Sequence, residues 1–138
     1  MKTIGVLTSG GDAQGMNAAV RAVVRTCVAE NITVMGIREG YKGLIEGNIQ
    51  ELTARDVCDI LGRGGTFLRS ARCPEFKTEE KIQEAVHTCK EFGIEGIVVI
   101  GGDGSFRGLV ELAKQGISVV GVPATIDNDI VCTDYTIG

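Results

Sequence analysis

The sequence is poor in proline and aromatic residues and contains no long apolar run. Two prolines, two tyrosines, four phenylalanines and no tryptophan occur among the 138 residues. No stretch approaches the ~20 consecutive apolar residues that a membrane-spanning helix needs. The apolar segment at the N-terminus is too short for the core of a secretory signal and is followed by no small-residue cleavage pattern. Because the five cysteines show no pattern typical of disulfides, we expect them to be reduced and the protein to be cytoplasmic.

Positive charge is also scarce, because 14 lysines and arginines face 18 acidic residues, a formal net charge of −4. Together with the few aromatics, this charge argues against a general nucleic-acid binder or a binder of anionic membranes. The five cysteines are odd in number and form no C-x-x-C pair, which argues against a disulfide framework or a zinc site. The apolar fraction of 43% predicts a folded domain rather than a disordered chain.

Glycine, by contrast, is abundant. The 20 glycines make up about 14% of the chain, twice the usual ~7%, and they occur in clusters. Neither standard nucleotide-binding fingerprint is present, because the chain contains no G-x-x-x-x-G-K-[ST] and no G-x-G-x-x-G. The glycines therefore predict functional turns of another kind.

Apolar strand-like segments alternate with amphipathic helical segments along the chain. A helix is predicted from Met16 to Cys27 and another after Thr78, which is placed to cap it. The segment 97–100 is apolar on both faces, as in a central parallel strand. This alternation predicts an α/β fold with a parallel sheet in a three-layer α/β/α sandwich, Rossmann-like in kind. The strands are expected at 3–8, 32–37, 94–100 and 117–122.

Three further segments carry weaker signals. Residues 39–52 are interrupted by glycines and predict irregular structure, and Thr53 is expected to cap a short helix through Ile60. The chain ends amid strand-like residues at 135–138, so we expect a domain that is cut rather than finished.

Three polar, glycine-bearing turns follow three of the predicted strands, at residues 10–12, 102–105 and 125–129. In an open parallel sheet, ligands bind at the carboxyl ends of the strands. Glycines allow backbone N–H groups to approach an anion, and each following helix presents its positive end. A single turn of this kind is as often an ordinary strand-to-helix connection. Three of them at one edge predict a binding site for a phosphorylated ligand.

The acidic residues of these turns suggest metal binding and acid–base chemistry. Asp103, flanked by glycines, suits Mg²⁺ held jointly with substrate phosphates, and Ser105 suits helix capping or a phosphate contact. Asp127 and Asp129 lie two residues apart, so in an extended loop both face one side and suit general-base work on a hydroxyl. The alternative for that loop is an Asx-rich surface turn. Arg72 is the expected source of positive charge for a transferred phosphoryl group.

Two other features have mainly structural interpretations. Arg21 and Arg25 share one face of a predicted helix, and spacing alone favours an exposed face over an anion site. His87, the only histidine, lies off the apolar stripe of its helix and is expected at the surface. Histidine-dependent catalytic triads are therefore excluded.

Taken together, the motifs closely resemble those of the bacterial-type ATP-dependent 6-phosphofructokinases. The resemblance implies the N-terminal, ATP-binding domain of a longer two-domain subunit, with the second, sugar-phosphate-binding domain absent. The matching segments are Gly-Val-Leu-Thr-Ser-Gly-Gly-Asp at 5–12, Gly-Met-Asn-Ala-Ala at 15–19, Ala-Arg-Cys-Pro-Glu-Phe at 71–76, Gly-Gly-Asp-Gly-Ser at 101–105 and Thr-Ile-Asp-Asn-Asp at 125–129.

The resemblance implies phosphorylation of fructose 6-phosphate to fructose 1,6-bisphosphate in glycolysis, with ATP as donor and Mg²⁺ as cofactor. Asp127 would accept the proton of the sugar 1-hydroxyl, with Thr125, Ile126 and Asp129 helping to position the sugar and metal. Asp103 would bind the magnesium. The resemblance further implies that Arg21 and Arg25 bind an ADP effector, and that full-length subunits form a homotetramer. ATP would contact Gly11, Arg72, Cys73, Gly102, Asp103, Gly104 and Ser105, with Gly11 and Arg72 nearest the transferred group.

Two positions bear on the phosphoryl donor. Relatives that use pyrophosphate typically carry an acid at position 104 and a lysine at 124, whereas this chain has Gly104 and Ala124, which favours ATP. Ala13-Gln14 and Ala124 depart from the residues frequent in the family. The alternatives are a catalytically inert nucleotide-binding fragment, or a related kinase that uses pyrophosphate or acts on NAD or a lipid.

Overall fold

The computed structural model describes residues 2–9, 15–57, 68, 78–101, 103–123 and 135–137. For 15–16, 103–105 and 135–137 only the backbone is described. The elements are β1 (Thr3–Thr8), α1 (Gly15–Ala29), β2 (Thr33–Ile37), α2 (Gly40–Glu46), β3 (Ile49–Leu52), α3 (Glu79–Glu91), β4 (Gly96–Gly101), α4 (Asp103–Lys114), β5 (Ser118–Pro123) and β6 (Tyr135–Ile137).

The strands form one six-stranded sheet in the order β3-β2-β1-β4-β5-β6. The four inner strands are parallel to one another, as predicted, and β3 and β6 pair with them antiparallel at the two edges. Thr8 is level with Ile100, and Gly101 is level with Pro123. The carboxyl ends of β1, β4 and β5 therefore lie side by side at one edge of the sheet.

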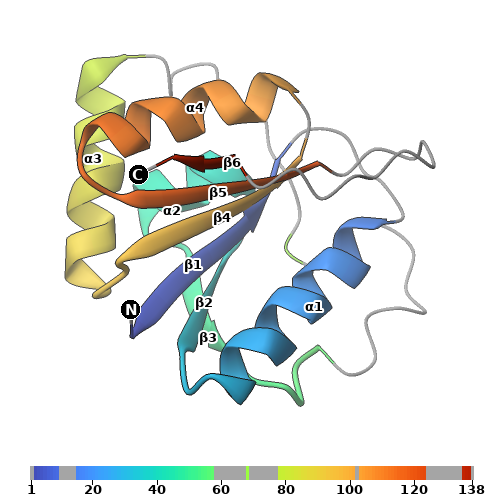
Figure 1. Ribbon diagram of the computed structural model, residues 1–138. Helices are drawn as coiled ribbons and strands as arrows, with labels where there is room; N and C mark the ends of the chain where they lie inside the picture. The colour runs from blue at the N-terminus through green and yellow to red at the C-terminus, as the bar shows by residue number, and fades with distance from the viewer. Residues whose placement is uncertain are drawn as a thin grey trace.

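Helices cover both faces of the sheet, which confirms the predicted three-layer sandwich (Figure 1). α1 covers one face, where Val20, Val24 and Cys27 are buried against strand residues such as Val6. Val24 is fully buried, whereas Val23 is only partly buried. α2, α3 and α4 cover the other face. Among the described helices, none combines the length and hydropathy needed to span a bilayer.

The helix predicted after Thr78 is confirmed in detail as α3. The Thr78 hydroxyl accepts a hydrogen bond from the backbone N–H of Lys81 at 3.4 Å, so it caps the helix. Two glutamates in the first turn complement the helix dipole. Ile82, Ala85, Val86 and Cys89 form the inner face of this helix, and all four are buried.

The prediction of irregular structure at 39–52 was wrong, because this segment contains α2 and β3. Glu39 and Gly40 both adopt left-handed backbone conformations, with φ of 63° and 61°, so the chain turns sharply from β2 into α2. Within α2, a Cβ atom on Gly43 would lie 1.6 Å from the carbonyl oxygen of Arg38. The glycines that suggested irregularity instead permit a close approach between helix and turn.

The short helix expected after Thr53 is only partly supported. Thr53 and Asp56 form hydrogen bonds with each other. The Thr53 N–H donates to Asp56 Oδ2 at 2.7 Å, and the Asp56 N–H donates to the Thr53 carbonyl oxygen at 3.0 Å. Residues 54–57 form a turn rather than a helix. Residues 58–60 lie outside the described part of the chain.

Candidate functional site

The first two predicted turns leave the sheet next to each other. The backbone N–H of Ser9, just beyond β1, donates to the carbonyl oxygen of Ile100 in β4 at 2.9 Å. Thr8 and Ser9 are both buried. The turn at 10–12 therefore begins beside the turn that follows β4.

The second turn is shorter than the sequence suggested. Only residue 102 separates β4 from α4, so Asp103, Gly104 and Ser105 form the first turn of the helix rather than a loop before it. The first N–H groups of a helix have no acceptor within the helix, and the helix dipole is positive at that end. The amino end of α4 therefore lies at the carboxyl edge of the sheet, where its first N–H groups are a suitable place for phosphate oxygens.

The third turn begins after Pro123, which is level with Gly101 of β4. The topology thus starts all three turns at one edge. The predicted site residues Gly11, Arg72, Cys73, Gly102, Thr125, Ile126, Asp127 and Asp129 lie outside the described residues, and their roles stay predictions.

Arg21 and Arg25 share one face of α1, as the spacing predicted. Arg25 is exposed, whereas Arg21 is partly buried. The Nε atom of Arg21 is buried and has no hydrogen-bond partner in the described part of the chain. A buried, unpaired guanidinium N–H is costly, so an anion bound at this face would stabilise it.

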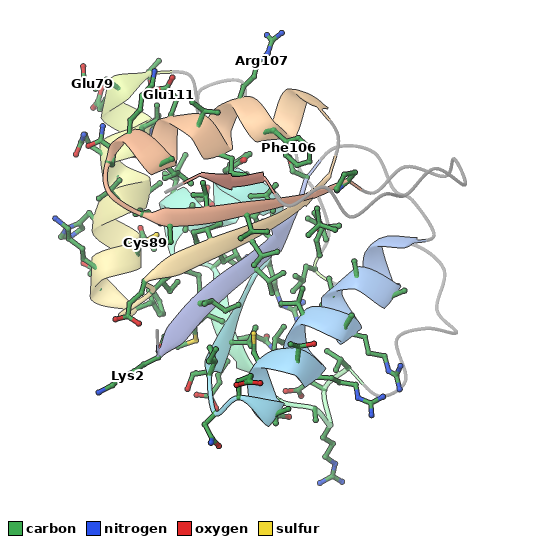
Figure 2. The ribbon with its side chains drawn as sticks, viewed as in Figure 1. Lys2, Glu79, Cys89, Phe106, Arg107 and Glu111 are labelled. Atoms are coloured by element: carbon green, nitrogen blue, oxygen red, sulfur yellow. The ribbon has the colours of Figure 1, made fainter. Side chains whose placement is uncertain are left out.

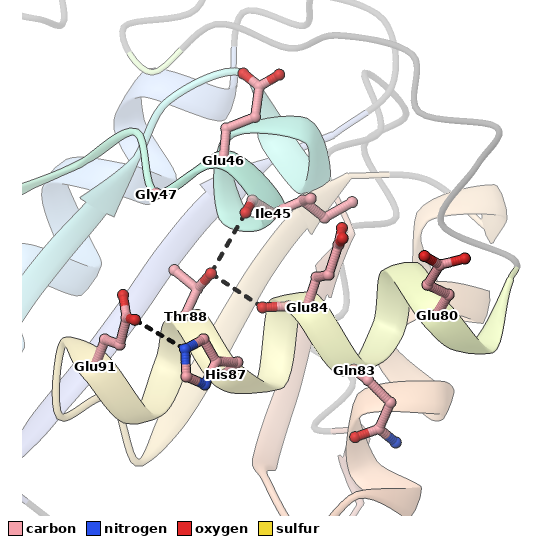
Figure 3. Close-up of a pocket in the computed structure, with 9 residues that line it drawn as sticks. All are labelled: Ile45, Glu46, Gly47, Glu80, Gln83, Glu84, His87, Thr88 and Glu91. Carbon is pink, nitrogen blue, oxygen red and sulfur yellow. Dashed lines mark hydrogen bonds and ion pairs between the residues drawn. The ribbon is translucent and has the colours of Figure 1, made fainter.

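A hollow on the described surface lies elsewhere, between α2 and α3 (Figure 3). Its volume is about 580 Å³, and four glutamates line it, namely Glu46, Glu80, Glu84 and Glu91. His87, at its rim, is exposed as predicted and lies 2.8 Å from a carboxylate oxygen of Glu91. Thr88 is buried, and its hydroxyl donates to the carbonyl oxygen of Glu84 at 3.0 Å. Because the negative charge of these four glutamates repels phosphate groups, the hollow does not suit ATP.

The two described cysteines, Cys27 and Cys89, are free and buried. Burial raises the pKa of both thiols, that of Cys89 to about 11, so neither forms a thiolate readily at neutral pH. Within the described ranges no group of three His, Cys, Asp or Glu residues is placed to hold a metal ion.

Leu68 is a residue that sequence analysis missed. It lies in the basic segment 62–72, yet its side chain is fully buried and its carbonyl oxygen accepts the backbone N–H of Glu39 at 2.9 Å. The available signal was an apolar pair, Phe67-Leu68, among glycines and arginines.

A model of the family described as Phosphofructokinase matches residues 3–138. The chain belongs to the phosphofructokinase family. It is 61% identical over 138 residues to the ATP-dependent 6-phosphofructokinase of Finegoldia magna and 62% identical over 139 residues to that of Halothermothrix orenii. The match covers 100% of this chain but 43% and 42% of those relatives, so the chain spans less than half of their length.

Solved phosphofructokinase structures share the fold. The T-state structure of the Pichia pastoris phosphofructokinase is 39% identical, with a TM-score of 0.87 over 99% of this chain and 18% of that one. The Saccharomyces cerevisiae structure, also 39% identical, gives 0.83 over 100% of this chain and 22% of that one. A pyrophosphate-dependent phosphofructokinase from Marinobacter aquaeolei is 20% identical, with a TM-score of 0.78 over 93% of this chain and 34% of that one. At that identity the last comparison supports the fold alone.

Proposed function

We propose that this protein is an ATP-dependent 6-phosphofructokinase, which transfers the terminal phosphoryl group of ATP to the 1-hydroxyl of fructose 6-phosphate in glycolysis. The observation that carries the proposal is the meeting of β1, β4 and β5 at one sheet edge, where the three motif-bearing turns begin. The relatives named for this activity are 61–62% identical over the chain. As a glycolytic enzyme it would work in the cytoplasm.

The amino end of α4 is the proposed cradle for the ATP phosphates. Gly102, Asp103, Gly104 and Ser105 would supply backbone N–H donors, and glycine at 104 leaves room for the α-phosphate and nucleoside. Asp103 would hold Mg²⁺, since one carboxylate beside substrate phosphates is a donor set that this ion prefers. The metal, when bound, neutralises charge on the phosphates.

The remaining roles follow the order of the turns. Asp127 would take the proton of the sugar hydroxyl as general base, and Thr125, Ile126 and Asp129 would orient the sugar around it. Arg72 and Gly11 would stabilise the transferred phosphoryl group, with Cys73 contacting ATP next to Arg72. Transfer of this kind depends mainly on alignment and charge stabilisation, which turns at one rim can provide.

We also propose that Arg21 and Arg25 form a binding site for an ADP effector. The buried, unpaired Nε of Arg21 supports an anion at this face of α1. The domain would act as the nucleotide-binding part of a two-domain subunit that assembles as a homotetramer, as the resemblance implies.

The test of the proposed function replaces Asp127 in the natural full-length protein. Asp127→Ser is expected to lower kcat by about 10²–10⁴-fold, because the general base is lost, with little change in ATP affinity. Asp56→Ser is the matched control, since Asp56 is an exposed carboxylate that caps a turn. Near-normal turnover of Asp127→Ser would overturn the assignment of the base.

A second candidate function is a nucleotide-binding module without turnover. The observation that favours it is the amino end of α4 at the sheet edge, which suits phosphate oxygens and so supports nucleotide binding without itself requiring turnover. A coupled assay of the 138-residue chain with Mg-ATP and fructose 6-phosphate separates the two, because any enzymatic formation of fructose 1,6-bisphosphate excludes an inert module. Parallel assays with pyrophosphate as donor, and with NAD or a lipid as acceptor, test the related kinases.

A further inference from the structure

The ring of Phe106 in α4 rests on Gly121, a glycine in the middle of β5. A Cβ atom at Gly121 would lie 2.9 Å from Cε1 and 3.1 Å from Cδ1 of Phe106, closer than carbon atoms normally pack. The same Cβ would lie 3.4 Å from Cδ2 of Leu109, about one helical turn further along α4. The lack of a side chain at Gly121 therefore lets this part of α4 approach β5 closely.

This contact lies beneath the first turn of α4. The helix begins at Asp103, so Phe106 is its fourth residue, and the ring is on the side of the helix that faces the sheet (Figure 2). Gly121 is level with Val99, which lies two residues before the carboxyl end of β4. The ring therefore meets β5 close to the sheet edge at which α4 begins.

The next turn of α4 is held by α2. Tyr41 of α2 is buried and forms a hydrogen bond with the backbone of Leu109. Leu109 is itself buried in the core cluster to which α2, α3 and α4 all contribute. The first half of α4 is thus held by β5 and by α2 at once, which leaves it little freedom to move relative to the sheet.

The turn of α4 that Phe106 completes is the proposed cradle for the ATP phosphates. The first N–H groups of a helix have no acceptor within it, and in α4 they belong to the residues from Asp103 to Phe106. Hydrogen bonds from N–H groups to oxygen span only about 2.7–3.2 Å, so a turn that moves by about 0.5 Å weakens them. The height of this turn above the sheet therefore decides how well it can bind phosphate.

We propose that Phe106 and Gly121 are a positioning pair for the phosphoryl donor. The ring, resting on a residue without a side chain, sets the height of the first turn of α4 and thereby where its N–H groups meet the phosphates of ATP. Both residues act through the helix backbone. The inference rests on the proposed function, because it takes this turn as the cradle for ATP. A misplacement of about 1 Å is enough to lower the rate of a positioned reaction ~10²-fold.

The test compares Gly121→Ala with Gly5→Ala in the natural full-length protein. A Cβ at Gly5 would also lie 2.9 Å from its nearest atom, Cδ1 of Ile37, but Gly5 pairs with Ile97 near the amino ends of β1 and β4. Neither glycine has a positive φ, so alanine suits both backbones and adds only the close contact. Urea unfolding should therefore show similar losses of stability for the two variants.

The two variants should differ in how they bind ATP. Gly121→Ala is expected to raise the Mg-ATP dissociation constant at least ~10-fold and to lower kcat, with the KM for fructose 6-phosphate unchanged, whereas Gly5→Ala should change each less than ~3-fold. Phe106→Ala, which removes the support from the turn, should raise the same dissociation constant at least ~10-fold more than Phe92→Ala. Phe92 is the matched control, because it packs against the same core cluster from the end of α3.

A double-mutant cycle with Phe106→Leu separates positioning from general stability. Leucine lacks the ring edge that a Cβ at residue 121 would meet, so in the Phe106→Leu background Gly121→Ala should raise the Mg-ATP dissociation constant less than ~3-fold. Equal fold changes in both backgrounds, or a change for Gly121→Ala no larger than that for Gly5→Ala, would overturn the proposal. A wild type that binds Mg-ATP without phosphorylating fructose 6-phosphate overturns the proposed function instead. The cycle measured on the dissociation constant then still decides the role of the pair.

Discussion

At the scale of single residues, burial decides the chemistry of the described thiols. Cys89 lies on the inner side of α3, facing the sheet (Figure 2), and its burial raises the thiol pKa from an ordinary value of 9.0 to about 11. Cys27 on α1 shows the same direction for the same reason. The sequence alone suggested reduced cysteines. It could not indicate which thiols are inert, because burial depends on how the helices pack.

The raised pKa of Cys89 predicts how stability depends on pH. The unfolded thiol ionises above pH 9 while the folded thiol stays neutral up to about pH 11, so the unfolded state loses protons first and stability falls across this window. This difference in pKa should lower the free energy of unfolding by about 2 kcal/mol by pH 11. Urea unfolding of the wild type and Cys89→Ala at pH 8, 9, 10 and 11 measures this pH dependence of the free energy of unfolding. The variant is less stable throughout but should decline less steeply, and parallel curves would contradict the assignment.

At the scale of elements, α2 and α3 show what a sequence reveals and what it hides. α3 carries its own start signal, a capping Thr78 followed by two glutamates, and its apolar stripe is regular. α2 begins after Glu39, whose side chain makes no capping hydrogen bond, and it contains glycines that normally weaken helices. Its stability depends on contacts with α3 and on the close approach of Gly43 to Arg38, which are tertiary features. A local pattern could not have predicted it.

The close approach at Gly43 predicts a large loss of stability on substitution. A methyl group at this position would lie 1.6 Å from the Arg38 carbonyl oxygen, a backbone atom that cannot rotate away, so α2 or the turn before it must shift. Gly43→Ala should lower the free energy of unfolding by about 3 kcal/mol or more. Urea unfolding monitored by circular dichroism measures the loss.

Gly47, at the end of the same helix, is the matched control for Gly43. Its φ of 79° is left-handed, but the nearest atom to an added Cβ is a ring carbon of Phe92 at 3.9 Å. Asparagine tolerates this conformation, so Gly47→Asn should lower the free energy of unfolding by less than about 1 kcal/mol. Equal losses for the two variants, or a gain for Gly43→Ala, would contradict the contact with Arg38 as the cause, because helix propensity alone would make Gly43→Ala stabilising.

At the scale of the whole molecule, the parallel topology was predictable and the links between distant segments were not. Alternating strands and helices were enough to place the turns after β1, β4 and β5 at one edge. Crossover connections between parallel strands are nearly always right-handed, which leaves few possible topologies. The antiparallel edge strands β3 and β6 were not predicted as such. The hydrogen bond between Glu39 and Leu68 joins residues that are far apart in sequence, so a local sequence pattern could not predict it.

The common edge predicts that the two substrates bind next to each other. In hydrogen-exchange mass spectrometry of the natural full-length protein, fructose 6-phosphate should slow amide exchange in peptides covering 123–130, because the third turn is assigned to the sugar. Mg-ATP should slow exchange in peptides covering 9–16 and 101–106 with one dissociation constant, because one ligand would bridge the turns after β1 and β4. Mg-AMP, which lacks the β- and γ-phosphates, should protect them far less, since the backbone donors at the start of α4 would lose their anionic partners. Peptides from the acidic hollow, such as 80–91, should be unaffected, because the glutamates there repel phosphate. Different Mg-ATP dissociation constants for 9–16 and 101–106, or protection confined to 80–91, would show that these turns do not form one site, and the proposed kinase activity would lose its structural basis.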